Sequence, residues 1–154
     1  MKLFFDVDYT ILSYDNGIRP GTHEVFEKLV ADGHHIYIWS GQGLRWGEIR
    51  DHKLDWCVTD VFHKPTWNYV ARLEELGVPL VPDFVVDDYL EIVEVFGGYN
   101  VKEFYRKRHA DEEMHDVYRT ICEFAEHGTS EHPSYRPRPA LLGREHLAAS
   151  DRIP

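Results

Sequence analysis

Short apolar runs alternate with helix-forming patterns along most of the chain. Runs typical of buried strands occupy residues 3–5, 35–39, 57–62, 83–86 and 101–105. Helical spacing, capping residues and stop signals predict helices at residues 22–32, 44–52, 66–76 and 89–96. Strands that alternate with helices on this scale predict an α/β fold built on a doubly wound parallel sheet.

The last third of the chain changes in character. Residues 110–126 form the clearest amphipathic pattern, and their apolar stripe is typical of core packing: Met114, Val117, Tyr118, Ile121 and Phe124. From residue 127 onward, X-Pro dipeptides and scattered charges replace this pattern and indicate an irregular or mobile tail. A length of 154 residues suits one compact domain. We therefore expect one folded domain at residues 1–127 and a tail at residues 128–154.

Two pairs of aspartates stand at predicted strand ends. Asp6 and Asp8 follow the first strand, and Asp87 and Asp88 follow the fourth. Ligands bind at the carboxyl ends of the strands in open α/β sheets. Carboxylates that converge there repel one another unless a cation or a shared proton neutralises them. The pattern therefore indicates a metal site or an acid–base pair in which one carboxylate could act as a nucleophile, although aspartate is also an ordinary turn residue.

The second and third predicted strands also end in polar residues. Ser40 is followed by Gly41, and a small hydroxyl with glycines after a strand lets backbone amides approach an oxyanion. The same residues are equally typical of an ordinary glycine-rich turn. Lys64 follows the third strand and precedes Pro65, which suits the first turn of a helix.

Together these residues resemble the four motifs of the haloacid dehalogenase (HAD) superfamily. The matching segments are FDVDYT at residues 5–10, YIWSG at 37–41, HKP at 63–65 and VVDD at 85–88. The resemblance implies a Rossmann-like, three-layer HAD-like fold and makes residues 1–127 a catalytic domain. It also implies a magnesium-dependent phosphatase, a phosphoric monoester hydrolase that forms an aspartyl-phosphate intermediate.

The resemblance also implies a role for each acidic residue. Asp6 would be the nucleophile, and Asp8 would protonate the leaving oxygen and later deprotonate the attacking water. Mg²⁺ would bind the Asp6 carboxylate, the Asp8 backbone carbonyl and Asp87, with Asp88 as an outer ligand. Dehalogenases lack a carboxylate at the second position, so Asp8 favours phosphoryl transfer.

The remaining motif residues would bind the phosphate. Ser40 and Gly41 would hold the phosphoryl oxygens, and Lys64 would both bind the phosphate and neutralise charge in the transition state. Thr10 would brace the loop.

Two features depart from the commonest pattern of the superfamily. Tyr9 stands where many members carry glycine, and its ring could narrow the pocket, stack on a substrate or simply pack outward. The stretches 11–22 and 41–64 leave no room for a cap domain, so we expect a capless enzyme with an open site. A second subunit of a homo-oligomer or the tail could cover that site. The tail carries four arginines that would suit an anionic pocket: Arg136, Arg138, Arg144 and Arg152.

Composition limits the partners and the compartment. The net charge of −10 argues against binding to nucleic acid or to an anionic membrane. The two cysteines form no disulfide framework, and the sequence shows no apolar run of membrane-spanning length and no signal-peptide pattern. We expect a cytoplasmic enzyme that acts on a phosphorylated small molecule. A phosphatase of a phosphoprotein or of a nucleic acid end, and an inactive HAD-like binding module, remain alternatives.

Overall fold

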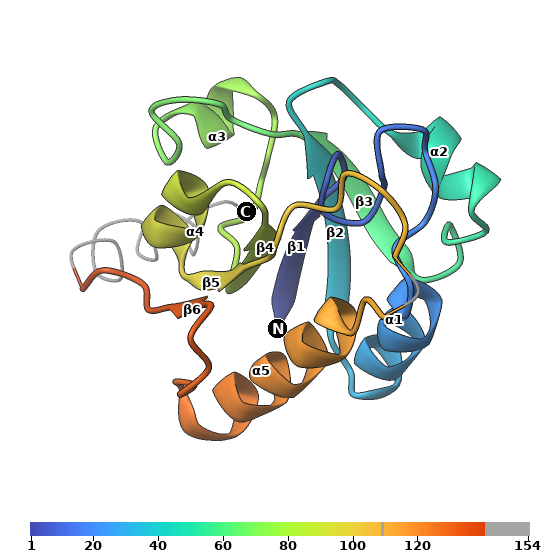
Figure 1. The fold of residues 1–154 in the computed structure, drawn as a ribbon. Coiled ribbons are helices and arrows are strands. Elements are labelled where there is room, and N and C mark those ends of the chain that lie inside the picture. Colours follow the sequence, from blue (N-terminus) through green and yellow to red (C-terminus); the bar gives the residue numbers. More distant parts are fainter. Residues whose placement is uncertain (109, 141–154) are drawn as a thin grey trace.

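One mixed sheet of six strands forms the centre of the molecule (Figure 1). The computed structural model describes residues 1–108 and 110–140. The strands follow the order β3-β2-β1-β4-β5-β6 across the sheet; β1 to β5 are parallel and β6 is antiparallel to β5. Their bounds are β1 Lys2–Asp6, β2 His35–Ser40, β3 Val58–His63, β4 Phe84–Asp87, β5 Gly98–Asn100 and β6 Tyr135–Arg136. The predicted α/β fold with a largely parallel sheet is thus confirmed.

Helices cover both faces of this sheet. Their bounds are α1 Thr22–Ala31, α2 Trp46–Asp51, α3 Arg72–Glu75, α4 Leu90–Phe96 and α5 Glu113–His127. Side chains alternate along β1, so that Phe5 lies in a core cluster with residues of α1, α2 and α5, whereas Phe4 lies in a second cluster with residues of α3 and α4. Two apolar cores therefore flank the sheet and fix β1 from both sides. Within the described residues, no helix is long and apolar enough to cross a membrane.

The fifth strand lies earlier in the chain than predicted. It comprises Gly98–Asn100, and residues 101–105 have no regular structure. A Cβ atom on Gly98 would lie 1.9 Å from the Val85 carbonyl oxygen, so only glycine lets β5 approach β4 this closely. Gly98 is therefore required within β5 itself, and the Gly97-Gly98 pair does more than end the preceding helix α4. Val101 and Phe104 are nevertheless buried, and their side chains hold the irregular segment 101–105 in place.

The helix predicted at residues 66–76 is also shorter than expected. Only Arg72–Glu75 is helical, and turns occupy most of the preceding residues. Asn68 has a φ of 47°, a left-handed conformation that a continuous right-handed helix excludes. Leu73 still packs in the second core, as its apolar pattern predicted.

The segment after α5 partly joins the sheet. We expected residues 128–154 to be irregular, but Tyr135 pairs with Tyr99 and extends the sheet by one strand. Arg138 Nε donates to the Phe96 carbonyl oxygen at 2.8 Å, and the same side chain contacts the carbonyl of Pro82 just before β4. This part of the tail therefore lies at the amino edge of the parallel strands and does not cover the predicted site. Residues 141–154, with Arg144 and Arg152, lie outside the described residues.

The strand order creates a switch point between β1 and β4. From β1 the chain proceeds outward through β2 and β3, and from β4 it proceeds outward on the other side through β5. Loops that leave adjacent strands in opposite directions open a crevice at the carboxyl edge of the sheet. Asp6 ends β1 and Asp87 ends β4, so both face this crevice.

Candidate active site

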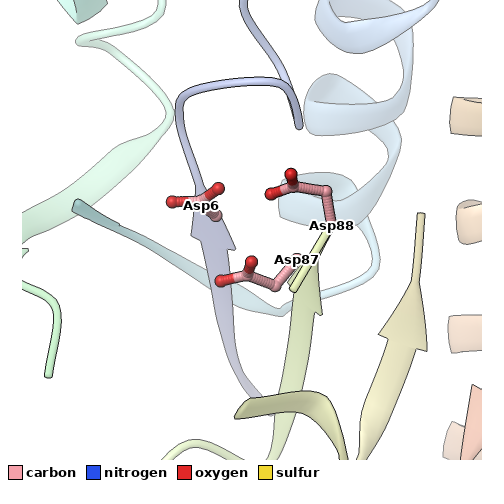
Figure 2. A group of neighbouring side chains, drawn as sticks. All are labelled: Asp6, Asp87 and Asp88. Atoms are coloured by element: carbon pink, nitrogen blue, oxygen red, sulfur yellow. The ribbon is translucent and has the colours of Figure 1, made fainter. Parts of the chain in front are cut away.

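Three carboxylates converge where β1 and β4 end (Figure 2). Asp6 and Asp87 are the last residues of their strands, and Asp88 follows directly. One oxygen from each of the three lies within 4.8 Å of the others. The Asp6 and Asp87 side chains are buried, whereas Asp88 is half-exposed at the crevice. The sheet thus holds two carboxylates in a place where water compensates their charge poorly.

Lys64 reaches into this cluster from the end of β3. Its Nζ lies 2.8 Å from Asp6 Oδ1 and 3.0 Å from Asp87 Oδ2. Its backbone N–H donates to the Ser40 carbonyl at 3.0 Å, which fixes the start of the lysine side chain against β2. Burial alone would lower the pKa of Lys64, but Asp6 and Asp87 outweigh that effect and raise it. Lys64 is therefore a permanent cation at the centre of the site.

Thr10 holds the opposite side of Asp6. Its hydroxyl lies 3.1 Å from Asp6 Oδ2 and 3.3 Å from Asp88 Oδ1, and it accepts the Asp88 N–H at 3.2 Å. A hydroxyl carries one proton, so it can donate to only one of the two carboxylates at a time. Thr10 therefore aligns Asp6 with Asp88 without neutralising either.

Burial shifts the titration of both inner carboxyls. It raises the pKa of Asp6 well above the ordinary 3.8, and the nearby Asp87 adds to this rise against the lowering effect of Lys64. It raises the pKa of Asp87 to about 6, again against Lys64 and against the N–H of Tyr89, which donates to Asp87 Oδ1 at 2.9 Å. When Asp6 and Asp87 are both ionised, their negative charge exceeds the positive charge that Lys64 supplies.

The donor set fits a hard divalent cation. Fully ionised, the three carboxylates and the Lys64 ammonium leave an excess of two negative charges. Carboxylate oxygens are the preferred ligands of Mg²⁺. Asp6, Asp87 and Asp88 are the residues whose side chains could hold such an ion.

Asp8 belongs to a second group beside the carboxylate cluster. Its Oδ2 atom accepts from Arg45 at 2.5 Å and lies 3.4 Å from the Ser40 hydroxyl. Arg45 is buried, and its Nε lies 2.9 Å from Glu48 Oε1 on α2. The Gln42 N–H donates to Ser40 Oγ at 3.1 Å. The loop after β2 thus positions both the hydroxyl and the cation that contact Asp8.

No protein-family model, curated protein or solved structure matches the chain. Function is therefore inferred from the geometry of these side chains.

The structure brings most of the predicted residues together. Asp6, Lys64, Asp87 and Asp88 form one cluster, and Asp8 and Ser40 lie side by side next to it. Exposed Gly41 follows Ser40 in the turn after β2. A Cβ atom there would lie 3.0 Å from Thr66 Cγ2, so a side chain would crowd the loop after β3.

Three residues of the site were missed. Arg45 carries a signal in the sequence, since it is a cation five residues after Ser40 in the same strand-end loop. Asn100 donates to the carbonyls of Asp87 and Asp88 at 3.1 and 3.0 Å, and it was hidden because the fifth strand was predicted too late in the chain.

Arg19 is the third missed residue, and it gave no sequence signal. It is buried, donates to the Thr10 carbonyl at 2.9 Å and to the Lys102 carbonyl at 2.5 Å, and pairs with Asp111 at 3.1 Å. It therefore ties the loop after β1 to the segment that holds Lys102 and Asp111.

Proposed function

We propose that this protein is a magnesium-dependent phosphatase that hydrolyses a phosphomonoester of a small molecule through an aspartyl-phosphate. The observation that carries the proposal is the environment of Asp6. One of its oxygens contacts Lys64 and the other contacts Thr10, and Asp87 and Asp88 lie beside it. A carboxylate fixed at both oxygens next to a cation and a divalent-ion donor set is preorganised to attack an anionic phosphoryl group.

Asp6 acts as the nucleophile in this proposal. Its carboxylate attacks the phosphorus, the bond to the leaving oxygen breaks, and the phosphoryl group is transferred to the Asp6 oxygen. Lys64 faces the same space and stabilises negative charge on the transferring oxygens. When bound at Asp6, Asp87 and Asp88, Mg²⁺ supplies positive charge that offsets repulsion between the carboxylates and the phosphate.

Asp8 transfers the protons. Its carboxyl group donates a proton to the departing alkoxide and later takes one from the water that cleaves the aspartyl-phosphate. Ser40 lies beside it and can donate its hydroxyl to a phosphoryl oxygen. Asp8, held by Arg45, therefore acts on the leaving oxygen, whereas Asp6, Lys64 and Ser40 act on the transferring phosphoryl group.

The four strand-end positions support placement in the HAD superfamily as a capless member. Asp6, Ser40, Lys64 and Asp87 follow four adjacent parallel strands at one edge of the sheet. Within residues 1–108 and 110–140, the loops after β1 and β2, at residues 7–21 and 41–45, carry no inserted domain over that edge. The site is accordingly open to small substrates from solution.

Phosphate release from phenyl phosphate, which is a phosphomonoester, with and without Mg²⁺ tests the proposal. The wild type should release phosphate only with Mg²⁺, and D6N should lose turnover, because an amide is not a nucleophile here. D8N should be slower by about 10²–10⁴-fold, since it keeps the nucleophile but loses proton transfer. D55N is the matched control, because Asp55 is exposed on the loop before β3, at the other end of the strands.

Trapping the intermediate gives a second measurement. Acid-quenched wild type turning over ³²P-labelled acetyl phosphate should carry a hydroxylamine-sensitive label at Asp6. Full activity of D6N, or of the wild type in chelator, would show that the proposed chemistry is wrong.

A further inference from the structure

A hollow of about 470 Å³ adjoins the proton-transfer group and has no part in the mechanism so far. It is lined by Asp8, Tyr9, Gln42, Leu44, Arg45 and Glu48. Its volume lies in the range of small-molecule sites. Because Asp8 protonates the departing oxygen in the proposed reaction, the hollow lies on the side where a leaving group must sit.

Tyr9 forms a fixed wall of this hollow. Its φ of 61° is rare for a bulky residue and persists only when the surroundings determine it. The Tyr9 N–H donates to the Leu12 carbonyl at 2.8 Å, and the Tyr9 carbonyl accepts from the Phe104 N–H at 2.7 Å. These two hydrogen bonds fix the Tyr9 backbone directly after Asp8.

A column of aromatic rings supports Tyr9 from behind. Tyr105 stacks on Tyr9 with centroids 5.9 Å apart, and Tyr14 stacks on Tyr105 at 4.9 Å. The Arg106 guanidinium lies 5.7 Å from the Tyr105 ring centroid and 6.0 Å from that of Tyr14. The Tyr14 N–H also donates to the Tyr105 carbonyl at 3.2 Å, so the two segments are held together. The Tyr9 ring is thus stacked on Tyr105, and Tyr9 also lines the hollow.

Leu44 lines the same hollow from the loop after β2. Its side chain is 56% exposed. A rigid aromatic ring and an apolar side chain in one hollow favour a flat apolar guest, because stacking on a fixed ring adds to simple area burial. The rest of the lining is polar or charged and consists of Asp8, Gln42, Arg45 and Glu48.

We propose that this hollow is the leaving-group subsite and that it takes a planar aromatic or heteroaromatic group, so that the substrate is a phosphomonoester of an aromatic alcohol. The inference rests on the proposed function, because the role of the hollow follows from the role of Asp8. It assigns Tyr9 as a specificity-determining residue and Leu44 as its partner.

Two phosphonates test the subsite without turnover. Benzylphosphonate and cyclohexylmethylphosphonate share the anionic group and the number of carbon atoms, but only the first has a planar ring. In calorimetric titrations of the full-length protein with Mg²⁺, benzylphosphonate should bind about 3- to 10-fold more tightly, as stacking beyond area burial predicts. Y9L should remove this preference, and L44S should weaken binding of benzylphosphonate. W56L is the control, because Trp56 is an exposed aromatic residue on the loop before β3 and should keep the preference.

The outcomes separate the two proposals. Equal affinity for both phosphonates, or a preference that survives in Y9L, would overturn the subsite. If Y9L fails to fold, L44S decides alone, and unchanged benzylphosphonate affinity there would overturn it. Preferential binding of benzylphosphonate without any phosphate release from benzyl phosphate would keep the hollow as a site for aromatic rings but refute the phosphatase and, with it, the leaving-group role.

Discussion

Lys64 Nζ lies 3.0 Å from Asp87 Oδ2, although the two residues come from strands that are not neighbours. Lys64 follows β3 and Asp87 ends β4, and β2 and β1 lie between them in the sheet. The lysine side chain therefore crosses the ends of two strands to reach a fully buried carboxylate. One ammonium shared by Asp6 and Asp87 leaves the site short of positive charge, and measurable consequences follow for stability.

The first consequence is a stability loss with rising pH in the metal-free protein. The pKa of Asp87 is about 6 in the folded chain, against an ordinary value of 3.8. Between these values the unfolded chain releases the proton first, so the free energy of unfolding falls as pH rises. At about 1.4 kcal/mol per pH unit the contribution of Asp87 is about 3 kcal/mol, present below pH of about 4 and lost above about 6. The raised pKa of Asp6 acts in the same direction.

Urea unfolding in the presence of a chelator, measured from about pH 4 to about pH 7.5, checks this expectation. By linkage, the slope of the unfolding free energy against pH gives the difference in bound protons between the unfolded and the folded chain. The wild-type profile should be compared with that of D87N, which lacks the titrating group. The wild type should lose stability relative to D87N as pH rises, and parallel profiles would contradict the assigned shift.

Removing a carboxylate should also separate stability from metal binding. D87N should raise the thermal midpoint of the metal-free protein at neutral pH, because it relieves repulsion with Asp6 and Asp88. It should also lose the increase in midpoint that millimolar Mg²⁺ gives to the wild type by binding only the folded state. D55N should behave like the wild type in both respects. A Mg²⁺-dependent increase that persists in D87N would exclude Asp87 as a ligand.

The sequence indicated the acidic cluster because the hydrophobic pattern shows where a strand ends. Alternating apolar runs located β1 and β4, and parallel strands bring Asp6 and Asp87 to the same edge whatever the loops do. Ser40 and Lys64 could be placed for the same reason, since Ser40 ends β2 and Lys64 directly follows β3.

The residues that depend on loop conformation could not be predicted in this way. Arg45 meets Asp8 only because the turn after Ser40 folds back over β2, and no periodicity encodes that turn. Asn100 was not identified from the sequence because Gly98 interrupts the apolar pattern of the strand. In the folded chain that glycine makes the close contact between β5 and Val85 possible. Arg19 approaches Thr10 and Lys102 through contacts that exist only after both segments are folded.

Asn100 should act on the cluster of Asp6, Asp87 and Asp88 through the backbone. Its amide holds the carbonyls of Asp87 and Asp88, and these bonds set the direction of both carboxylates. N100L removes both bonds at similar side-chain volume and should weaken Mg²⁺ binding by about 10- to 100-fold, as for other residues that orient ligands. Calorimetric titration with Mg²⁺ measures this directly. Circular dichroism should show an intact fold, and unchanged Mg²⁺ affinity would refute the positioning role.

Arg45 should govern proton transfer without taking part in phosphate attack. Its guanidinium lies 2.5 Å from Asp8 Oδ2 and is itself held next to Glu48, so it fixes where the Asp8 carboxyl points. R45M should therefore lower kcat by about 10- to 100-fold, less than the about 10²–10⁴-fold expected for D8N, because the proton-transfer group remains but is no longer aligned. R50M is the matched control, since Arg50 lies on α2, which begins directly after Arg45, is exposed and contacts only the Trp46 ring among the aromatic groups described. Quenched-flow measurements with labelled acetyl phosphate distinguish positioning from simple loss of structure. In R45M the Asp6-linked label should form and then persist, because hydrolysis of the intermediate also needs Asp8. Wild-type kcat in R45M, or a loss of activity without accumulation of the labelled intermediate, would show that Arg45 does not position Asp8 for hydrolysis.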